Sequence, residues 1–441
     1  MMTVVVSKLS WIVSVVFLIS VVALVGYQFP AKTPLAHYQL WYPLSTAKEN
    51  AAPGPNTSNR SELYVGEAGL AAASPVPLEG RFEESTRSRV AVCLVGGARA
   101  FELTGKTLMK YVLNAYNDTD VFLHSPLDKD SHKFSLLSGA SGLASARVFI
   151  PKQLPESRLQ REVLTAANSP NGIQGLLQYF HLVEGCLEMI TEHESKHNIK
   201  YDWIVRTRVD GYWRGPLPPL SSFNSSVYYI PHGSHYGGLN DRLGIGNSEN
   251  SRVALSRLSL LPLLHKRGAR NLNSETAFKA QLKFTNLWYS STNFPFCILT
   301  YRKYSWPPAY FGVPVASLST KGDLNGAKCR PCTPKSSGSE AQRLVSKLSK
   351  GWGWPGLIDG LELCDAHQDW EPQWRTVYEK ESGEQLSGDA QRVTTRSVSE
   401  CVRDMEEFQK QWEVWDAPPP LKICSEGRED EVYSDSDESV N

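Results

Sequence analysis

Two arginines and an aspartate occupy alternate positions at the end of a predicted strand. The apolar run 203–205 is followed by Arg206, Arg208 and Asp210. Residues two apart in a strand project from the same face, so we expect both guanidinium groups and the carboxylate on one side. Guanidinium groups suit bidentate contacts with phosphate, and a carboxylate beside them can hold a divalent metal ion or a ribose hydroxyl. A structural Arg–Asp ion pair is the alternative, but the carboxyl end of a strand favours a ligand site.

A pair of glycines ends another predicted strand. The apolar run 90–95 leads into Gly96 and Gly97, and Arg99 follows two residues later. Glycines let a phosphate-bearing ligand approach the backbone closely, and Arg99 could meet the charge of that ligand. A tight turn without any ligand would also explain the two glycines.

Two further carboxylates lie in segments rich in polar or capping residues. Asp241 belongs to a glycine-rich loop, 236–246, that also carries an amide and a guanidinium group. Glu275 follows Asn273 and Ser274, either of which can cap a helix whose first turn favours an acidic residue. A surface turn and simple helix capping are the structural alternatives for these two segments.

Two short motifs resemble metal sites but have good structural explanations. His193 and His197 fit the H-E-x-x-H pattern of zinc proteases, yet they end a predicted helix, where histidines complement the helix dipole. Lys200 stands where the extended form of that pattern has glycine. Asp128 and Asp130 form a D-x-D after the second predicted strand, which suits a solvated turn as well as a metal ion.

The cysteines predict structural disulfides. Cys329 and Cys332 form a C-x-x-C before a Ser/Gly/Lys-rich linker, which does not suit a thioredoxin-like redox site. No second C-x-x-C completes a zinc site. We therefore expect these two cysteines to form disulfides with Cys364, Cys401 or Cys424.

Strands alternate with helices along the middle of the chain, which predicts an α/β domain with a mostly parallel, Rossmann-like sheet flanked by helices. The strongest predicted helix begins with Ser169 as its cap and Pro170 in its first turn. The predicted strands are 90–95, 121–124, 147–150, 203–205, 227–230, 297–301 and 313–316, and the predicted helices are 104–114, 170–197, 251–264, 274–284 and 398–412.

Composition narrows the class of protein. The chain has 441 residues with 46 basic and 46 acidic side chains, and 41% of its residues are hydrophobic. That apolar content is sufficient for a large core. The zero net charge argues against a general nucleic-acid binder, which needs a basic surface to neutralise phosphates.

The N-terminal region predicts a membrane anchor. Residues 9–27 contain no charge and, as a helix, would span roughly 28 Å, close to the thickness of a bilayer's hydrocarbon core. The glycosylation candidates Asn56, Asn59, Asn117 and Asn224 and all eight cysteines lie beyond this segment, which indicates a type II protein with its bulk in an oxidising secretory lumen such as the Golgi. The predicted regions are a cytosolic tail (1–8), a transmembrane signal anchor (9–27), a stem (28–88), the α/β domain (89–333), a Cys/Trp-rich C-terminal extension (334–425) and an acidic disordered tail (426–441).

Five segments of the α/β domain resemble a known family. In this order, 90–99, 120–124, 201–210, 240–246 and 273–275 are similar to an uncharacterised land-plant family of single-pass membrane proteins. The series also resembles nucleotide-sugar glycosyltransferases of the GT-A type, with a strand ending in R-x-R-x-D where the usual D-x-D lies. The similarity to the plant family covers the α/β domain, and the similarity to GT-A enzymes rests on short motifs in the right order.

The resemblance implies a GT-A-like fold and a nucleotide-sugar donor. The residues that it places at the donor are Gly96, Gly97, Arg99, Arg206 and Arg208. It makes Asp210 the metal or sugar-nucleotide carboxylate and places Asp241 or Glu275 near the acceptor as the catalytic base. Because one carboxylate stands where a D-x-D supplies two, dependence on Mn²⁺ or Mg²⁺ stays open.

We therefore expect a lumenal, membrane-anchored glycosyltransferase that acts on a glycan or glycoprotein acceptor. The alternative is a non-catalytic lectin-like or scaffold protein with a vestigial donor site. A metalloprotease built on His193 and His197 is the third hypothesis.

Overall fold

The computed structural model describes residues 88–167, 169, 171–305, 313–348, 354, 356 and 358–426. These residues belong to one of the two compact units of the chain, Arg81–Asn441. The predicted cytosolic tail, the anchor, the stem up to Arg87 and the acidic tail beyond Glu426 lie outside the described residues. Across the described ranges, no helix has both the length and the apolar character needed to cross a membrane.

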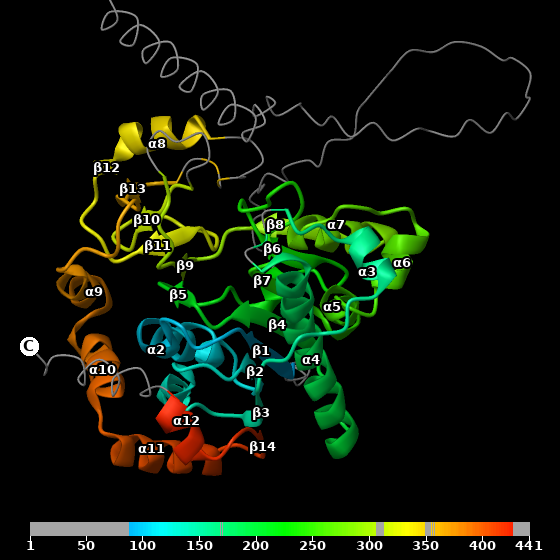
Figure 1. Cartoon of the computed structure of the whole chain (residues 1–441), viewed down its shortest axis with the longest axis horizontal. Coiled ribbons are helices and arrows are strands. Elements are labelled where there is room, and N and C mark those ends of the chain that lie inside the picture. Colours follow the sequence, from blue (N-terminus) through cyan, green and yellow to red (C-terminus); the bar gives the residue numbers. More distant parts are fainter. Residues whose placement is uncertain are drawn as a thin grey trace, which may run out of the picture. The chain divides into compact units, whose positions relative to one another are not determined.

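An eight-stranded sheet forms the centre of the unit, in the order β14-β3-β2-β1-β4-β7-β6-β8 (Figure 1). Its first five strands run parallel to one another, so the carboxyl ends of β1 and β4 meet at the same edge. The strands are β1 (Val90–Val95), β2 (Thr119–Pro126), β3 (Leu143–Phe149), β4 (Trp203–Arg208), β6 (Tyr228–Pro231), β7 (Leu243–Asn247), β8 (Tyr289–Thr292) and β14 (Val414–Asp416).

A second, six-stranded sheet has the order β12-β13-β10-β11-β9-β5. Parallel pairs join β10 to β11 and β11 to β9, whereas β5, β12 and β13 pair with antiparallel neighbours. Its strands are β5 (Gly211–Trp213), β9 (Phe296–Leu299), β10 (Ala316–Ser317), β11 (Lys328–Arg330), β12 (Ser336–Ser337) and β13 (Glu362–Leu363).

The prediction of a mostly parallel sheet is confirmed in part, because most neighbouring strands of the main sheet are parallel but the sheet is mixed. Strand β7 runs antiparallel to both β4 and β6. The first part of β7 lies in the segment predicted as a glycine-rich loop, but Gly244 and Gly246 make room for a neighbouring ring. A Cβ at Gly244 would lie 1.9 Å from the Tyr228 hydroxyl oxygen, and one at Gly246 would lie 2.6 Å from the Tyr228 ring. These glycines therefore serve packing within a strand.

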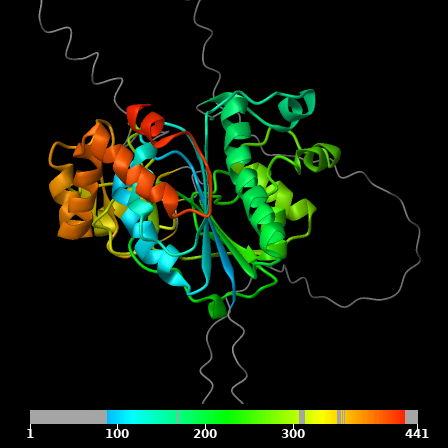
Figure 2. The same ribbon diagram turned by 90° about the horizontal axis from the view of Figure 1, so that it is seen from below.

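Helices cover both faces of the main sheet (Figure 2). Val90, Val92 and Leu94 of β1 join the core that includes α2 and α11, whereas Ala91, Cys93 and Val95 join the core that includes α4 and α7. This alternation is the period of two expected for a strand buried on both faces. The helices are α2 (Phe101–Tyr111), α3 (Arg158–Val163), α4 (Gly172–His197), α5 (Ser248–Leu255), α6 (Leu261–Lys266), α7 (Ser274–Phe284), α8 (Gly338–Ser346), α9 (Trp374–Ser382), α10 (Glu384–Thr395), α11 (Val398–Lys410) and α12 (Pro420–Glu426), with 3₁₀ turns η1 (Leu113–Ala115), η2 (Ser131–Leu137) and η3 (Leu220–Ser222).

The long helix α4 differs from the prediction only at its start. It begins at Gly172, and Asn171 occupies the cap position without a side-chain cap bond. The predicted cap, Ser169, instead donates a hydrogen bond from Oγ to the Gly172 carbonyl, with an O–O distance of 2.8 Å. Pro170 lies outside the described residues.

The C-terminal region contributes strands and helices to the sheets and core of the α/β domain. Strand β14 extends the main sheet beside β3, and β13 pairs with β10 and β12 in the second sheet. Helix α11 contributes Met405 and Phe408 to the core on one face of the main sheet. Residues on both sides of the predicted 333/334 boundary therefore share one sheet and one core.

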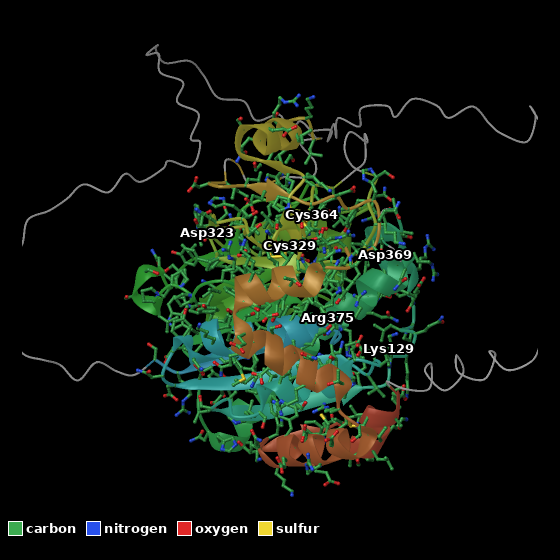
Figure 3. The ribbon with its side chains drawn as sticks, turned by 90° about the vertical axis from the view of Figure 1, so that its left-hand side faces the viewer. Lys129, Asp323, Cys329, Cys364, Asp369 and Arg375 are labelled. Carbon is green, nitrogen blue, oxygen red and sulfur yellow. A yellow bond between two sulfur atoms is a disulfide. The ribbon has the colours of Figure 1, made fainter. Side chains whose placement is uncertain are left out.

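All eight cysteines form disulfides, and the C-x-x-C cysteines do not bond to each other. Cys332 pairs with Cys364, as the sequence analysis allowed, whereas Cys329 pairs with Cys297. Figure 3 labels Cys329 and Cys364 in the region of the second sheet. The other two disulfides are Cys93–Cys186, which ties β1 to α4, and Cys401–Cys424, which ties α11 to α12.

Candidate functional site

Arg208 and Asp210 form a bidentate ion pair at the carboxyl end of β4. The Arg208 Nε lies 2.8 Å from Asp210 Oδ1, and its Nη2 lies 2.6 Å from Asp210 Oδ2. The two side chains are 29% and 13% exposed, respectively. A guanidinium group has five N–H donors, and within the described residues Arg208 uses two of them for hydrogen bonds. The pair therefore keeps unused donors that solvent or a ligand can reach.

A cluster of cations surrounds Asp210. Burial alone would raise the pKa of its carboxyl, but Arg208, Lys328 and Arg99 outweigh burial and lower that pKa to about 2. Burial, together with repulsion from Arg242 and Arg208, holds the pKa of Lys328 well below its usual value. Two guanidinium groups, a lysine amine whose proton an anion would help to retain, and a single carboxylate thus meet at this edge, which favours an anionic ligand.

The glycine turn after β1 lies beside this cluster. Gly96 has a φ of 125°, and a Cβ there would lie 3.2 Å from the Val209 side chain, one residue from Asp210. A Cβ at Gly97 would lie 2.5 Å from an Asp128 oxygen. That same oxygen, Asp128 Oδ2, accepts a hydrogen bond from the Ala98 amide at 3.0 Å. Asp128 of the D-x-D therefore stabilises the turn through this hydrogen bond. Close packing against Val209 and Asp128 explains why positions 96 and 97 are glycines.

Arg206 is placed differently from the prediction, because it is only 1% exposed. Its Nη1 donates to the Asp241 carbonyl oxygen and, at 3.4 Å, to the Tyr179 hydroxyl of α4. As predicted from the alternation of side chains along β4, Arg206 and Arg208 share a face of the strand. Helix α4 packs over the part of that face that holds Arg206 and buries its side chain. Arg206 positions the loop around Asp241 and does not offer its guanidinium group to a ligand.

Asp241 is also enclosed. Ser274 donates a hydrogen bond from Oγ to Asp241 Oδ2 at 2.6 Å, and Arg257 Nη1 lies 3.6 Å from the same oxygen. Burial would raise the pKa of this carboxyl, but Arg257 and Arg206 outweigh burial and lower it. With an 8% exposed side chain, Asp241 stays ionised and poorly accessible.

Glu275 shows the opposite shift from its acidic neighbour. It lies in the first turn of α7, which Asn273 caps by accepting a hydrogen bond from the Thr276 amide at 2.8 Å, so the capping prediction is confirmed. Burial, followed by repulsion from Asp241, raises the pKa of Glu275 to about 7. Two carboxyls with pKa values pushed apart are typical of an acid–base pair in an active site, and Glu275 is the member able to exchange a proton near neutral pH.

Glycine at position 238 permits the approach between the loop of Asp241 and α7. A Cβ at Gly238 would lie 2.0 Å from the Glu275 carbonyl oxygen. We expect Gly238→Ala to lower the free energy of unfolding by about 1–3 kcal/mol, because backbone must move to relieve the contact. Thermal and denaturant unfolding measure this change. Gly388→Ala in α10 is the control: its Cβ would meet nothing within 4 Å, so a neutral or stabilising effect is expected. Equal effects of the two substitutions would contradict this close packing.

Sequence reasoning missed Lys328, Tyr179 and Arg257. Lys328 begins β11 of the second sheet, and Arg257 follows α5, so neither is adjacent in sequence to the motif that it supports. The guanidinium carbon of Arg257 lies 4.7 Å from the ring centroids of both Phe180 and Phe278. A buried arginine on aromatic rings has no pattern in a single sequence that would identify it.

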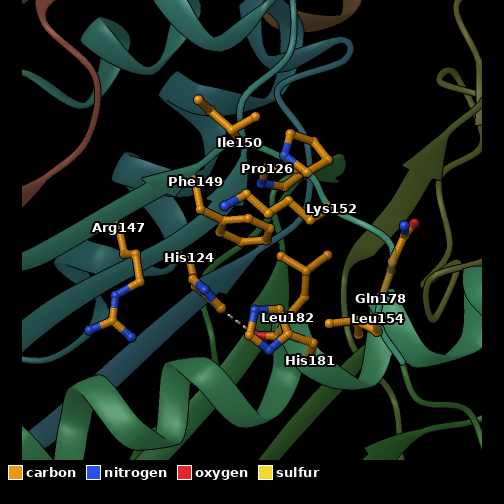
Figure 4. A pocket seen from close by; sticks show the side chains of 11 residues that line it. His124, Pro126, Arg147, Phe149, Ile150, Lys152, Leu154, Gln178, His181 and Leu182 are labelled. Atoms are coloured by element: carbon orange, nitrogen blue, oxygen red, sulfur yellow. Dashed lines mark hydrogen bonds between the residues drawn. The ribbon is translucent and has the colours of Figure 1, made fainter. Parts of the chain in front are cut away.

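A mainly apolar cavity of about 510 Å³ lies elsewhere along the same sheet edge (Figure 4). Its lining includes Pro126 and Phe149, which end β2 and β3, and His181 and Leu182 of α4. Burial lowers the pKa of His124 in this cavity to about 4, and its Nδ1 lies 2.9 Å from the Leu182 carbonyl oxygen. None of the predicted donor or catalytic residues lines the cavity.

Two of the predicted glycosylation positions can be located. Asn117 and Asn224 are both exposed in loops of the described region. Asn56 and Asn59 lie outside the described residues.

The fold and site define a mixed α/β protein with a cationic cluster at the carboxyl edge of its parallel strands. The chain belongs to the family described as "Domain of unknown function (DUF7796)", whose model matches residues 85–430. The comparison with curated proteins gave no match. One similar solved structure is the apo form of mouse xyloside xylosyltransferase 1, with 12% sequence identity, a TM-score of 0.30 and coverage of 47% of this chain and 85% of that chain. This similarity is too low to transfer an activity.

Proposed function

We propose that the chain is a glycosyltransferase that moves a sugar from a nucleotide-sugar donor to a glycan or glycoprotein acceptor. One observation carries the proposal: Arg208 has N–H donors that form no hydrogen bond with the described residues, and it lies in a cluster of cations at the carboxyl edge of β1 and β4. That edge is where open α/β sheets bind their ligands. A diphosphate supplies the negative charge and the acceptor oxygens that such a cluster lacks.

The same cluster would favour bond cleavage as well as binding. When the bond between the sugar C1 and the diphosphate breaks, negative charge develops on the leaving group. Fixed cations beside the leaving group then stabilise the transition state more than the ground state. Arg208 has this role, with Arg99 adding to the positive potential, while Asp210 orients the guanidinium group.

The side chains around Asp210 fit cationic binding of the diphosphate better than a resident Mn²⁺ or Mg²⁺. Both carboxylate oxygens of Asp210 accept hydrogen bonds from Arg208. Among the described residues, the group of three His, Cys, Asp or Glu side chains close enough to share a metal ion lies elsewhere, at His193, His197 and Glu413. We therefore assign no step of the reaction to a metal ion.

Glu275 is the proposed general base. In an inverting transfer, a carboxylate must take the proton of the acceptor hydroxyl, which a group with a pKa of about 7 can do near neutral pH. Asp241 is a positioning residue in this scheme, because its buried negative charge contributes to the raised pKa of Glu275.

A non-catalytic glycan-binding protein is the second candidate function. Trp370 and Tyr301 stack with ring centroids 4.1 Å apart, and Tyr301 is exposed. An exposed aromatic pair of this kind offers a flat surface to a sugar ring. This candidate predicts glycan binding that does not depend on any nucleotide.

We further propose that the chain enters the secretory lumen through the anchor predicted at 9–27. Four disulfides and exposed sequons at Asn117 and Asn224 are typical of an oxidising, glycosylating compartment. Endoglycosidase treatment should therefore increase the gel mobility of the expressed chain, and less so after Asn117→Gln or Asn224→Gln. Unchanged mobility would contradict a lumenal location.

A nucleotide panel tests the proposed function. The melting temperature of the purified full-length protein should rise with at least one nucleoside diphosphate or nucleotide sugar and not with the corresponding nucleoside. A folded protein that is indifferent to every nucleotide in the panel would contradict the proposal. If it still bound glycans, the second candidate would be supported instead.

A further inference from the structure

Two histidines of α4 converge with a glutamate from the C-terminal region. His193 Nε2 lies 3.2 Å from Glu413 Oε2, and His197 Nε2 lies 2.7 Å from Glu413 Oε1. One ligand atom from each of the three residues lies within 4.8 Å of the others. Glu413 is separated from the histidines by more than two hundred residues, and the structure brings it to them because its amide donates to the Leu143 carbonyl at 3.0 Å, next to the β14–β3 pairing.

A hydrogen-bond chain fixes which nitrogen of His193 is protonated. The Tyr201 hydroxyl donates to Asp120 Oδ2 at 2.7 Å, and an ionised carboxylate can only accept. Since the hydroxyl has a single proton, it must accept from His193 Nδ1, which lies 2.9 Å away. The Nδ1 of His193 therefore carries a proton, and Nε2 is the nitrogen that faces Glu413.

This arrangement suits a cation shared by His193 and Glu413. A neutral imidazole would direct the Nε2 lone pair at a carboxylate oxygen, and two acceptors do not attract each other. His193 is only 8% exposed, so water has little access to separate the two groups. A metal ion bound by both groups would satisfy the two facing acceptors.

We infer that His193, His197 and Glu413 bind a divalent transition metal ion, zinc above all. Zinc lies about 2.0–2.2 Å from imidazole nitrogens and carboxylate oxygens, so its ligand atoms are about 3.3 Å apart. That value falls within the range of separations found here, from 2.7 Å to at most 4.8 Å. The Tyr201–Asp120 pair behind His193 is the kind of hydrogen-bond support that orients metal-binding histidines. His197 and Glu413 are exposed, so the ion can enter from solvent.

The proposed metal site is structural and is not the active site of a protease. The Glu of the H-E-x-x-H pattern, Glu194, has a fully buried side chain that pairs with Arg252 and Lys200. It accepts a further hydrogen bond from the Tyr201 amide at 3.1 Å. Glu194 therefore cannot act as a general base on a metal-bound water. The ion would instead join the end of α4 to the segment that precedes β14.

One charged neighbour opposes metal binding and provides a sharp test. Lys196 Nζ lies 2.6 Å from Glu413 Oε1, but its side chain is 57% exposed and is free to turn into solvent. If the group binds a dication, removing this ammonium group with Lys196→Ala should preserve or raise the zinc affinity. If Lys196 and Glu413 instead form a purely structural ion pair, Lys196→Ala should only lower the melting temperature, and no zinc should bind.

The experiment uses the purified full-length chain, stripped with a chelator and then titrated with Zn²⁺ against a competing chromophoric chelator. We expect one zinc ion per chain and a higher melting temperature with zinc than without it. His197→Gln and Glu413→Gln, both at exposed positions, should lower zinc affinity at least tenfold, and Lys196→Ala should preserve or raise it. Tyr201→Phe should lower the affinity by roughly 10- to 100-fold through loss of the bond to His193.

His265→Gln is the matched control, because His265 Nε2 also lies 2.7 Å from a carboxylate oxygen, that of Glu162, without a second imidazole in the group. It should leave zinc binding unchanged. Failure of the wild-type chain to bind zinc at one equivalent would overturn the inference, as would equal zinc affinity in His197→Gln, Glu413→Gln and the wild type. Zinc binding is measured without nucleotide, so its outcome is independent of the proposed transferase activity.

Discussion

Replacing Glu275 by glutamine should reduce the rate of sugar transfer by about 10²- to 10⁴-fold, the usual contribution of a general base. Glutamine keeps the size of the side chain but cannot accept the proton of the acceptor hydroxyl. Affinity for the nucleotide donor should change little, since Glu275 acts on the acceptor side. Separate measurements of kcat and donor Kd test this division.

The pH dependence of the wild-type rate adds an independent test. The base must be deprotonated, so a pKa of about 7 predicts that the rate rises with pH up to about 7 and then levels off. Glu249→Gln is the matched control, because Glu249 occupies the first turn of α5 as Glu275 does that of α7, and it is exposed. A Glu275→Gln enzyme that retains the wild-type rate and pH profile would exclude Glu275 as the base.

Replacing Arg208 by lysine should weaken binding of the nucleoside diphosphate by roughly 10- to 100-fold, since hydrogen bonds to charged groups contribute about 1.5–3 kcal/mol each. Lysine keeps a positive charge beside Asp210, so the partly buried carboxylate retains a counterion and the fold is preserved. What disappears is the planar group that can bind Asp210 and a phosphate at once.

Arg158→Lys is the control for replacing an ion-paired arginine by lysine elsewhere in the protein. Arg158 pairs with Glu162 on α3 at 2.8 Å and is 87% exposed, far in sequence from the cluster. Diphosphate affinity should be unchanged in this variant. If both substitutions weakened binding equally, the loss would not come from the planar guanidinium group of Arg208, and the proposed site there would be contradicted.

The sequence could predict strand β4 and which of its side chains share a face. It could not predict that helix α4 buries part of that face. Alternation along β4 places Arg206 and Arg208 on one side, and Asp210 pairs with Arg208 from the turn that follows the strand. Whether a guanidinium group on that side meets solvent depends on Tyr179 of α4, a contact between residues distant in sequence. The helix cap at Asn273 was predictable because capping is local.

The features that the sequence could not predict are strand direction and contacts between residues far apart in the chain. An apolar run indicates a buried strand but not its direction, so the antiparallel β7 was missed and its glycines were assigned to a loop. Lys328 and Glu413 come from the second sheet and the C-terminal region, and nothing near them in sequence marks them as neighbours of Asp210 or His193. Such convergence arises from tertiary packing alone.

The central claim is that the cations around Asp210 hold a pyrophosphate group. Calorimetric titration of the full-length protein with a nucleoside diphosphate and with the monophosphate of the same nucleoside tests it most directly. We expect the diphosphate to bind at least about tenfold more tightly than the monophosphate, and Arg208→Lys to remove most of this difference. Equal affinities for the two nucleotides, or a preference that survives in Arg208→Lys, would contradict it.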